Sequence, residues 1–322
     1  MMAPPIPPRS LRLLPEEVAA RNFWEMAREA VAGDVSRLSL RDFWESFNDA
    51  CAALPSPGNP AVRGILACRV VEAADNDTLR ALSGDARIGI LAELDAALHG
   101  WKLKERPVVR LLTTAPFSPE YAAWLTPRVS KAADLLAKGV DLAFQRRNWS
   151  CMKGEDKLAF ARRTAELYAQ AFGINPPPTV EPFAEGPSPD GRILSGQYDA
   201  RRNVIRLNTA AASSWSDSDS LFYAAIHECQ HAVQYHLMDG RLDAPELHER
   251  TLLRWNDRFY VTWKDSTLGN AAEYQAQIME RDANFVADTI VKTTIYCEMM
   301  RSGVKPGNTP LSAQRRKTCP HR

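Results

Sequence analysis

The chain has 322 residues, 45% of them hydrophobic, and a formal net charge of +1. This length is enough for two domains with apolar cores, and the near-neutral charge provides no overall attraction to nucleic acid or to an anionic membrane. No apolar run reaches transmembrane length. The six cysteines lack paired spacing and the amino terminus lacks the apolar core of a secretory signal, so we expect reduced thiols in a cytoplasmic protein.

The first 150 residues have the pattern of a helical domain. Residues 1–9 are a proline-rich lead that we expect to be flexible, and residues 10–150 are expected to form the domain. Helices are predicted over residues 15–33, 39–47, 61–74, 77–99 with an interruption near Gly84, and 119–145. The pairs Phe23-Trp24 and Phe43-Trp44 lie at helical spacing, which is typical of core anchors. Nothing in this half indicates a function.

Residues 151–300 predict a second domain that contains strands as well as helices. A helix over 155–172 ends at Gly173, and a short extended segment follows over 179–183. Residues 192–198 and 203–208 alternate in polarity around a turn at 199–202, which predicts a hairpin. Residues 301–322 are polar and contain proline and glycine, so we expect a disordered tail.

The segment His227-Glu228-Cys229-Gln230-His231 is an HExxH motif. Its flanks, residues 221–226 and 232–235, contain no proline, glycine or charge, so we predict a buried helix over about 219–238, with an N-cap among residues 218–220 and Gly240 just past its end. Positions i and i+4 share a helix face, so both imidazoles can reach one metal ion, while Glu228 lies at the edge of that face as a general base. Cys229 points to the opposite side and is expected to pack in the core.

This motif resembles that of the zincin metallopeptidases, and the resemblance covers roughly residues 154–300. In that family a twisted sheet precedes the HExxH helix, and its edge strand binds the peptide substrate in extended form. The resemblance implies that the hairpin at 192–208 is the equivalent edge, although a plain structural hairpin is the alternative. The implied fold class is mainly α, with a helical N-terminal domain and a small α+β zincin-like C-terminal domain.

A catalytic zinc usually has three protein ligands, so a third is needed. The helix over 273–287 resembles the downstream helix of gluzincins, in which a ligand glutamate is followed three residues later by a small residue. This implies Glu280 as the ligand and Ala283 as the small residue. One turn later, where relatives often carry an aspartate that orients a ligand histidine, this chain has Asn284, which could accept the same imidazole N–H.

Two other residues remain candidates for the third ligand. Glu273 also begins a Glu-x-x-Ala unit, two turns before Glu280. His248 follows His231 at a distance similar to that in SprT-like DNA-repair proteases, which use a third histidine. His236 lies off the ligand face of the helix and is interpreted as structural or exposed.

The resemblance implies a zinc metallopeptidase that hydrolyses peptide bonds, with Zn²⁺ held by His227, His231 and Glu280 and a peptide or protein as substrate. The donor that stabilises the oxyanion is left open among Tyr223, Tyr274, Tyr296 and His248. One alternative is a non-catalytic zinc-binding scaffold or regulatory protein that acts through its helical N-terminal domain. Another is a zincin domain acting near DNA, against which the neutral net charge argues.

Overall fold

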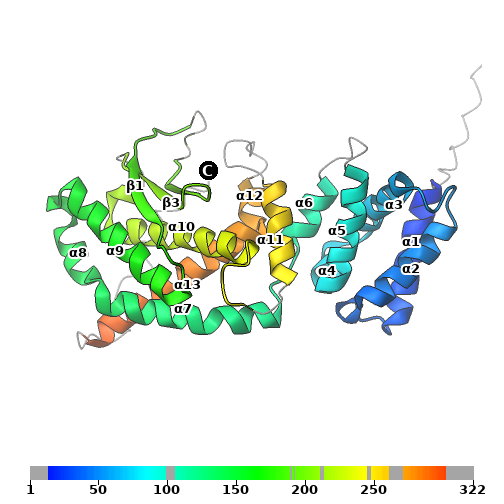
Figure 1. The fold of residues 1–322 in the computed structure, drawn as a ribbon, viewed down its shortest axis with the longest axis horizontal. Coiled ribbons are helices and arrows are strands. Elements are labelled where there is room, and N and C mark those ends of the chain that lie inside the picture. Colours follow the sequence, from blue (N-terminus) through cyan, green and yellow to red (C-terminus); the bar gives the residue numbers. More distant parts are fainter. Residues whose placement is uncertain are drawn as a thin grey trace, which may run out of the picture. The chain divides into compact units, whose positions relative to one another are not determined.

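The computed structural model describes residues 14–98, 106–188, 191, 193–210, 214–244, 248–260 and 271–301. These residues are mainly helical, with one small three-stranded sheet (Figure 1). None of the described helices is both long and apolar enough to cross a membrane. The predicted lead at 1–9 and the tail at 301–322 lie outside the described residues, except for Arg301, which ends the last helix.

The chain divides into two compact units. Unit 1 comprises the residues up to Ser118 together with His248–Tyr260 and Ala276–Ile278, and unit 2 comprises the remainder. The division follows Ser118, whereas the sequence pattern places a domain boundary near residue 150. The difference arises because the helix that begins at Pro119 packs in unit 2, where Trp124 contacts Phe172 with ring centroids 6.4 Å apart.

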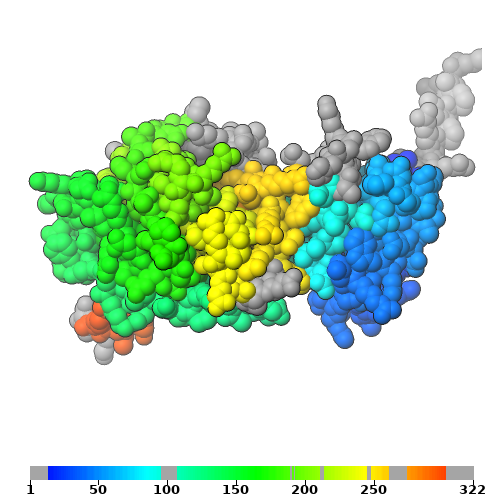
Figure 2. Space-filling model, viewed as in Figure 1, coloured from blue at the N-terminus to red at the C-terminus, as the bar shows by residue number. Residues whose placement is uncertain are grey.

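Unit 1 is helical throughout its described part, as predicted for the N-terminal region. Its elements are α1 (Pro15–Ala30), a 3-10 turn (Val35–Arg37), α2 (Leu40–Ala52), α3 (Pro60–Ala73), α4 (Asn76–Ala81), α5 (Gly84–Leu98), α6 (Arg106–Thr113) and α11 (His248–Arg258). The predicted interruption near Gly84 separates α4 from α5. Helix α3 packs against α1 and α5, and α2 packs against the same two helices; the surface of this part of unit 1 is blue to cyan in Figure 2.

The core of unit 1 is aromatic. Phe23, Phe43 and Phe47 are fully buried and lie within 5.4–6.0 Å of one another, measured between ring centroids. A Cβ atom on Gly89 of α5 would lie 2.5 Å from the ring of Phe43, so glycine permits this close helix packing. Trp24 is also buried, and its indole N–H donates to the carbonyl of Val70 at 2.9 Å. Phe23, Trp24 and Phe43 therefore anchor a core, as predicted, whereas Trp44 is half-buried.

Unit 2 combines helices with the sheet. Its elements are α7 (Pro119–Gly139), α8 (Leu142–Asn148), a 3-10 turn (Trp149–Cys151), α9 (Gly154–Phe172), β1 (Thr179–Phe183), β2 (Gly196–Asp199), β3 (Val204–Asn208), a second 3-10 turn (Ser214–Ser216) and α10 (Ser218–Met238). Two helices follow at the end of the described chain, α12 (Ala271–Ala276) and α13 (Ile278–Arg301). The helix predicted over 119–145 is thus two helices, and that predicted over 273–287 breaks at Gln277.

The sheet has the strand order β1-β3-β2, with β1 parallel and β2 antiparallel to β3. The predicted hairpin is therefore present, with Arg192 outside the described residues. Antiparallel neighbours alternate between pairs that hydrogen-bond to each other and pairs that do not. The N–H of Asn208 donates to the carbonyl of Ser195 at 2.9 Å, so Gly196 and Tyr198 direct their backbone groups away from β3, toward the outer edge of β2.

Helix α10 runs beneath the sheet (Figure 1) and matches the predicted span within one residue. It begins one residue earlier than the sequence indicates, because Asp217 is the N-cap and its side chain accepts from the N–H of Ser220 at 2.8 Å. It ends at Met238, and Gly240 follows with a positive φ of +72°. Most of its side chains are buried, so α10 is the central helix of unit 2.

Candidate metal centre

Helix α10 presents two imidazoles on one face, a single turn apart. The Nε2 atoms of His227 and His231 lie 3.1 Å from each other, and their side chains are only 13% and 10% exposed. The rings meet edge to face, with centroids 4.8 Å apart. This is the arrangement expected of residues at i and i+4 when both rings turn toward one point.

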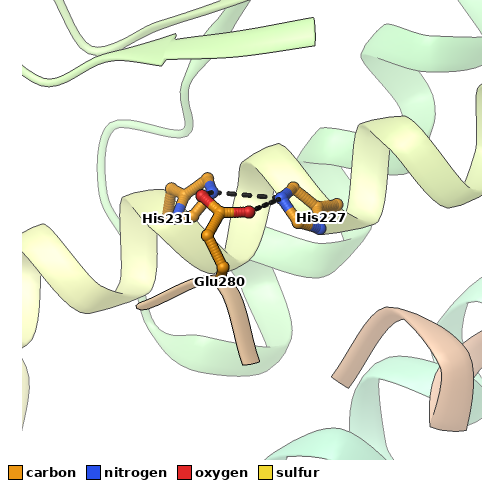
Figure 3. A group of neighbouring side chains, drawn as sticks. All are labelled: His227, His231 and Glu280. Carbon is orange, nitrogen blue, oxygen red and sulfur yellow. Dashed lines mark hydrogen bonds and ion pairs between the residues drawn. The ribbon is translucent and has the colours of Figure 1, made fainter. Parts of the chain in front are cut away.

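Glu280, in the first turn of α13, completes the group. Its Oε2 lies 3.4 Å from Nε2 of His227, and its Oε1 lies 3.4 Å from Nε2 of His231. Figure 3 shows the carboxylate facing both imidazoles from the neighbouring helix. The ligand atoms of the three residues lie within 4.8 Å of one another, so the group could hold a metal ion. The structure thus brings together the three residues that the sequence suggested as ligands.

The electrostatics of the group favour a cation at its centre. Two Nε2 atoms at this separation cannot both present lone pairs without repulsion, so a proton or a metal ion is required between them. Burial lowers the pKa of His231, but the nearby carboxylate of Glu280 has the larger opposite effect and raises that pKa to about 9. Burial likewise opposes ionisation of Glu280, yet the two histidines hold the pKa of that carboxyl well below its usual range.

Glu228 lies beside this group, buried between α10 and β2. A Cβ atom on Gly196 would come within 2.9 Å of its Cγ and 3.0 Å of its Oε1, so the side chain rests directly on the strand backbone. Burial raises the pKa of Glu228, while His227, His231 and the backbone N–H of Tyr198 lower it. A buried carboxylate next to a metal site is a suitable proton acceptor.

The structure identifies a partner of His231 that sequence reasoning missed. Gln234, one turn further along α10 and fully buried, places its Oε1 2.8 Å from Nδ1 of His231. Its Nε2 donates to Asp282 at 2.8 Å and to the carbonyl of Met279 at 2.9 Å. The position of Gln234, three residues after His231 in an apolar helix, is the sequence feature that could have indicated this contact.

Asn284 does not take the predicted position behind a ligand histidine. Its carboxamide oxygen accepts from the hydroxyl of Tyr223 at 2.8 Å, and within the described chain it makes no hydrogen bond to His227 or His231. The Tyr223 ring stacks against His227, with centroids 6.3 Å apart. Asn284 is therefore linked to His227 through Tyr223 and does not hydrogen-bond the imidazole itself.

His248 is not part of the group. Nε2 of His248 lies 3.0 Å from Oδ1 of Asp85 within unit 1, and its ring fills the space beside Gly84. The side chain of Glu273 lies outside the described residues. His236 is buried, and burial lowers its pKa. Among the suggested oxyanion donors, Tyr296 is exposed and Tyr223 is bound to Asn284.

We compared the chain with protein-family models, with curated proteins and with solved structures, and none of the three comparisons found a match. The case for a function therefore rests on the geometry of the metal centre and on the strand beside it.

Proposed function

We propose that this protein is a zinc-dependent metallopeptidase of zincin type, with His227, His231 and Glu280 as zinc ligands and Glu228 as the general base. The observation that carries the proposal is the convergence of these three ligand atoms next to a buried carboxylate. A structural zinc site is closed by four protein ligands, whereas a catalytic site has three and leaves one position open. The three ligands that converge among the described residues therefore favour catalysis.

The separations of the ligand atoms fit zinc. Tetrahedral zinc with bonds of about 2.0–2.1 Å to nitrogen and oxygen has ligand atoms about 3.3–3.4 Å apart. The two Nε2 atoms here lie 3.1 Å apart, each lies 3.4 Å from a different oxygen of Glu280, and one ligand atom from each residue can be chosen with all three within 4.8 Å of one another. Two imidazoles and one carboxylate are also donors that zinc accepts readily, whereas calcium and magnesium prefer oxygen donors alone.

Zinc in this position would supply a Lewis acid that polarises a carbonyl and makes water more acidic. Glu228 would accept the proton as water attacks the carbonyl carbon of a peptide bond, and would then deliver it to the leaving amine. The burial that raises the pKa of Glu228 suits both steps, since the group must take up a proton and release it again.

The outer edge of β2 supports a peptide as the substrate. Gly196 and Tyr198 direct backbone groups to this edge, where the N–H of Tyr198 donates to Glu228, so the N–H and C=O of Gly196 and the C=O of Tyr198 are the groups considered for a substrate. An extended peptide could add here as a further strand, because main-chain hydrogen bonds recognise a backbone whatever its side chains. Such a peptide would pass the general base at Gly196, where the absence of a side chain leaves the closest approach.

The test combines metal analysis with a proteolysis assay on the full chain. The purified protein should contain close to one zinc per chain and cleave unstructured peptides such as labelled casein fragments, and removal of zinc with a chelator should abolish cleavage. Glu228→Gln should retain zinc and lose turnover by about 10²–10⁴-fold. Glu181→Gln, an exposed acid on β1 paired with Arg202, is the matched control. Zinc without cleavage in the unsubstituted protein would support a zinc-binding scaffold instead.

A further inference from the structure

A buried polar cluster lies behind His231, and the proposed chemistry does not use it directly. Oδ2 of Asp282 accepts three hydrogen bonds, from Nε2 of Gln230 at 2.6 Å, from Nε2 of Gln234 at 2.8 Å and from the hydroxyl of Tyr121 at 3.0 Å. All four side chains are at most 1% exposed. Buried polar groups carry a desolvation cost, so a cluster of this size next to a metal centre requires an explanation.

The contacts of Gln234 determine which way its amide faces. The carbonyl of Met279 can only accept a hydrogen bond, so the group 2.9 Å from it must be the NH₂ of Gln234. Oε1 of Gln234 is then the atom 2.8 Å from Nδ1 of His231, and it must accept. Nδ1 therefore carries a proton, and in the neutral ring that binds a metal the lone pair of His231 lies on Nε2, facing His227 and Glu280.

We propose that Gln234 is the positioning residue of His231, and that the Asp282 carboxylate anchors it. Gln234 holds the imidazole in the tautomer and orientation that a metal requires, and it transmits part of the negative charge of Asp282 to the ring. This inference rests on the proposed metal centre. It also distinguishes the two imidazoles, because Nδ1 of His227 is buried and has no hydrogen-bond partner among the described residues.

The chain contains a matched control for this proposal. Gln230 and Gln234 lie one turn apart on α10, are both fully buried, and both donate to Oδ2 of Asp282. Of the two, Gln234 is the one whose side chain hydrogen-bonds the imidazole of His231. Gln230 also accepts from the hydroxyl of Tyr168 at 2.5 Å, so its loss disrupts the cluster at least as much. A purely structural role for the cluster therefore predicts that Gln230→Met is as harmful as Gln234→Met.

The experiment measures zinc affinity of the full chain by competition with a chromophoric chelator, and ligand geometry by the visible spectrum of the cobalt-substituted protein. Gln234→Met should weaken zinc binding about 10–100-fold and change the cobalt spectrum. Gln230→Met should bind zinc nearly as well as the unsubstituted protein. Equal losses in the two variants, or no loss in Gln234→Met, would overturn the proposal.

A second variant keeps the test decisive if Gln234→Met does not fold. The double variant Gln234→Glu with Asp282→Asn keeps an acceptor for Nδ1 and keeps a single negative charge. The charge moves from residue 282 to residue 234, whose side chain contacts His231 directly. Both double variants lose the donor to the Met279 carbonyl, so they are compared with each other, and Gln234→Glu with Asp282→Asn should bind zinc about tenfold more tightly than Gln234→Leu with Asp282→Asn. If the unsubstituted protein binds no zinc, the proposed function itself is wrong. If it binds zinc and the double variants behave alike, only the role of Gln234 is wrong.

Discussion

The interiors of the two units treat buried charge in opposite ways. In unit 1, Arg87 is almost fully buried, and it donates to the backbone carbonyls of Leu79 and Leu111. Glu93 is held by the guanidinium of Arg63 through Oε1 and Oε2. Glu93 thus pairs with an opposite charge, and Arg87 is solvated by backbone carbonyls. A protein core accommodates ionisable groups through such contacts.

The interior of unit 2 is different, because two imidazoles and two carboxylates meet there without neutralising one another completely. His227 and His231 face each other through Nε2, and Glu280 cannot pair fully with both. Such an arrangement costs stability unless a cation occupies it. The comparison teaches that the aromatic core of unit 1 serves folding, whereas the buried group of imidazoles and carboxylates shared by α10 and α13 is where function is to be sought.

The largest effect is expected from removing a ligand. His231→Ala should weaken zinc binding by more than about 10²-fold, since losing a ligand costs more than losing its hydrogen-bond partner. His236→Ala, which removes a buried histidine of the same helix outside the metal group, should leave zinc affinity nearly unchanged. Chelator competition measures both. A His231→Ala protein that still binds zinc tightly would refute the ligand assignment and the contrast between the two cores.

A substitution in the aromatic core of unit 1 should lower stability without changing zinc affinity. Phe43→Ala should lower the free energy of unfolding by about 3–5 kcal/mol, because it opens a cavity among Phe23 and Phe47. The zinc affinity of the folded protein should stay unchanged. Urea denaturation followed by circular dichroism, with Val18→Ala at an exposed position of α1 as control, measures the stability. Loss of zinc affinity in a folded Phe43→Ala protein would show that the core of unit 1 does more than stabilise the fold.

The metal-free protein should lose stability as the pH rises through about 9. The pKa of His231 is raised from 6.5 to about 9 in the folded state, so its contribution is fully present below 6.5 and is lost as the pH rises through 9. The contribution is on the order of 3 kcal/mol. Urea denaturation at several pH values measures it, and His231→Asn should remove the dependence. If the stability of His231→Asn fell with pH in the same way, a group other than His231 would cause the pH dependence.

A moderate effect is expected where the strand meets the general base. Gly196→Ala should reduce turnover roughly tenfold with zinc retained, because the new Cβ atom would displace Glu228 by a fraction of an ångström. Gly154→Ala is the control, since a Cβ atom there meets nothing within 4 Å. Steady-state kinetics with a peptide substrate measures the change. Full activity in Gly196→Ala would mean that Glu228 does not depend on its contact with β2.

The smallest effect is expected at Cys229, which lies inside the motif but is buried away from the metal group. Cys229→Ser should leave kcat/KM within about twofold and should lower stability by roughly 1 kcal/mol, because it buries a hydroxyl. Burial raises the pKa of the Cys229 thiol, so the thiol should resist alkylation under conditions that modify the exposed Cys151. Damage to catalysis comparable to that of His231→Ala would indicate a different chemistry.

The sequence by itself determined the local features of this protein. The apolar flanks of the motif predicted α10 within one residue, and helical spacing placed His227 and His231 on one face. The alternation of residues predicted the hairpin of β2 and β3, and the Phe-Trp pairs predicted an aromatic helical core. These features depend on hydrogen bonds and spacing within one element or between neighbours, so a short stretch of sequence contains them.

The tertiary structure alone decided among residues distant in the chain. Glu280 and His248 were both open as ligands, and only the packing of α13 against α10 brought Glu280 to the histidines, while His248 paired with Asp85 in unit 1. The same packing gave His231 the partner Gln234 rather than Asn284. Such choices depend on how two helices cross, and side-chain periodicity describes one helix at a time, so the sequence pattern could not make them.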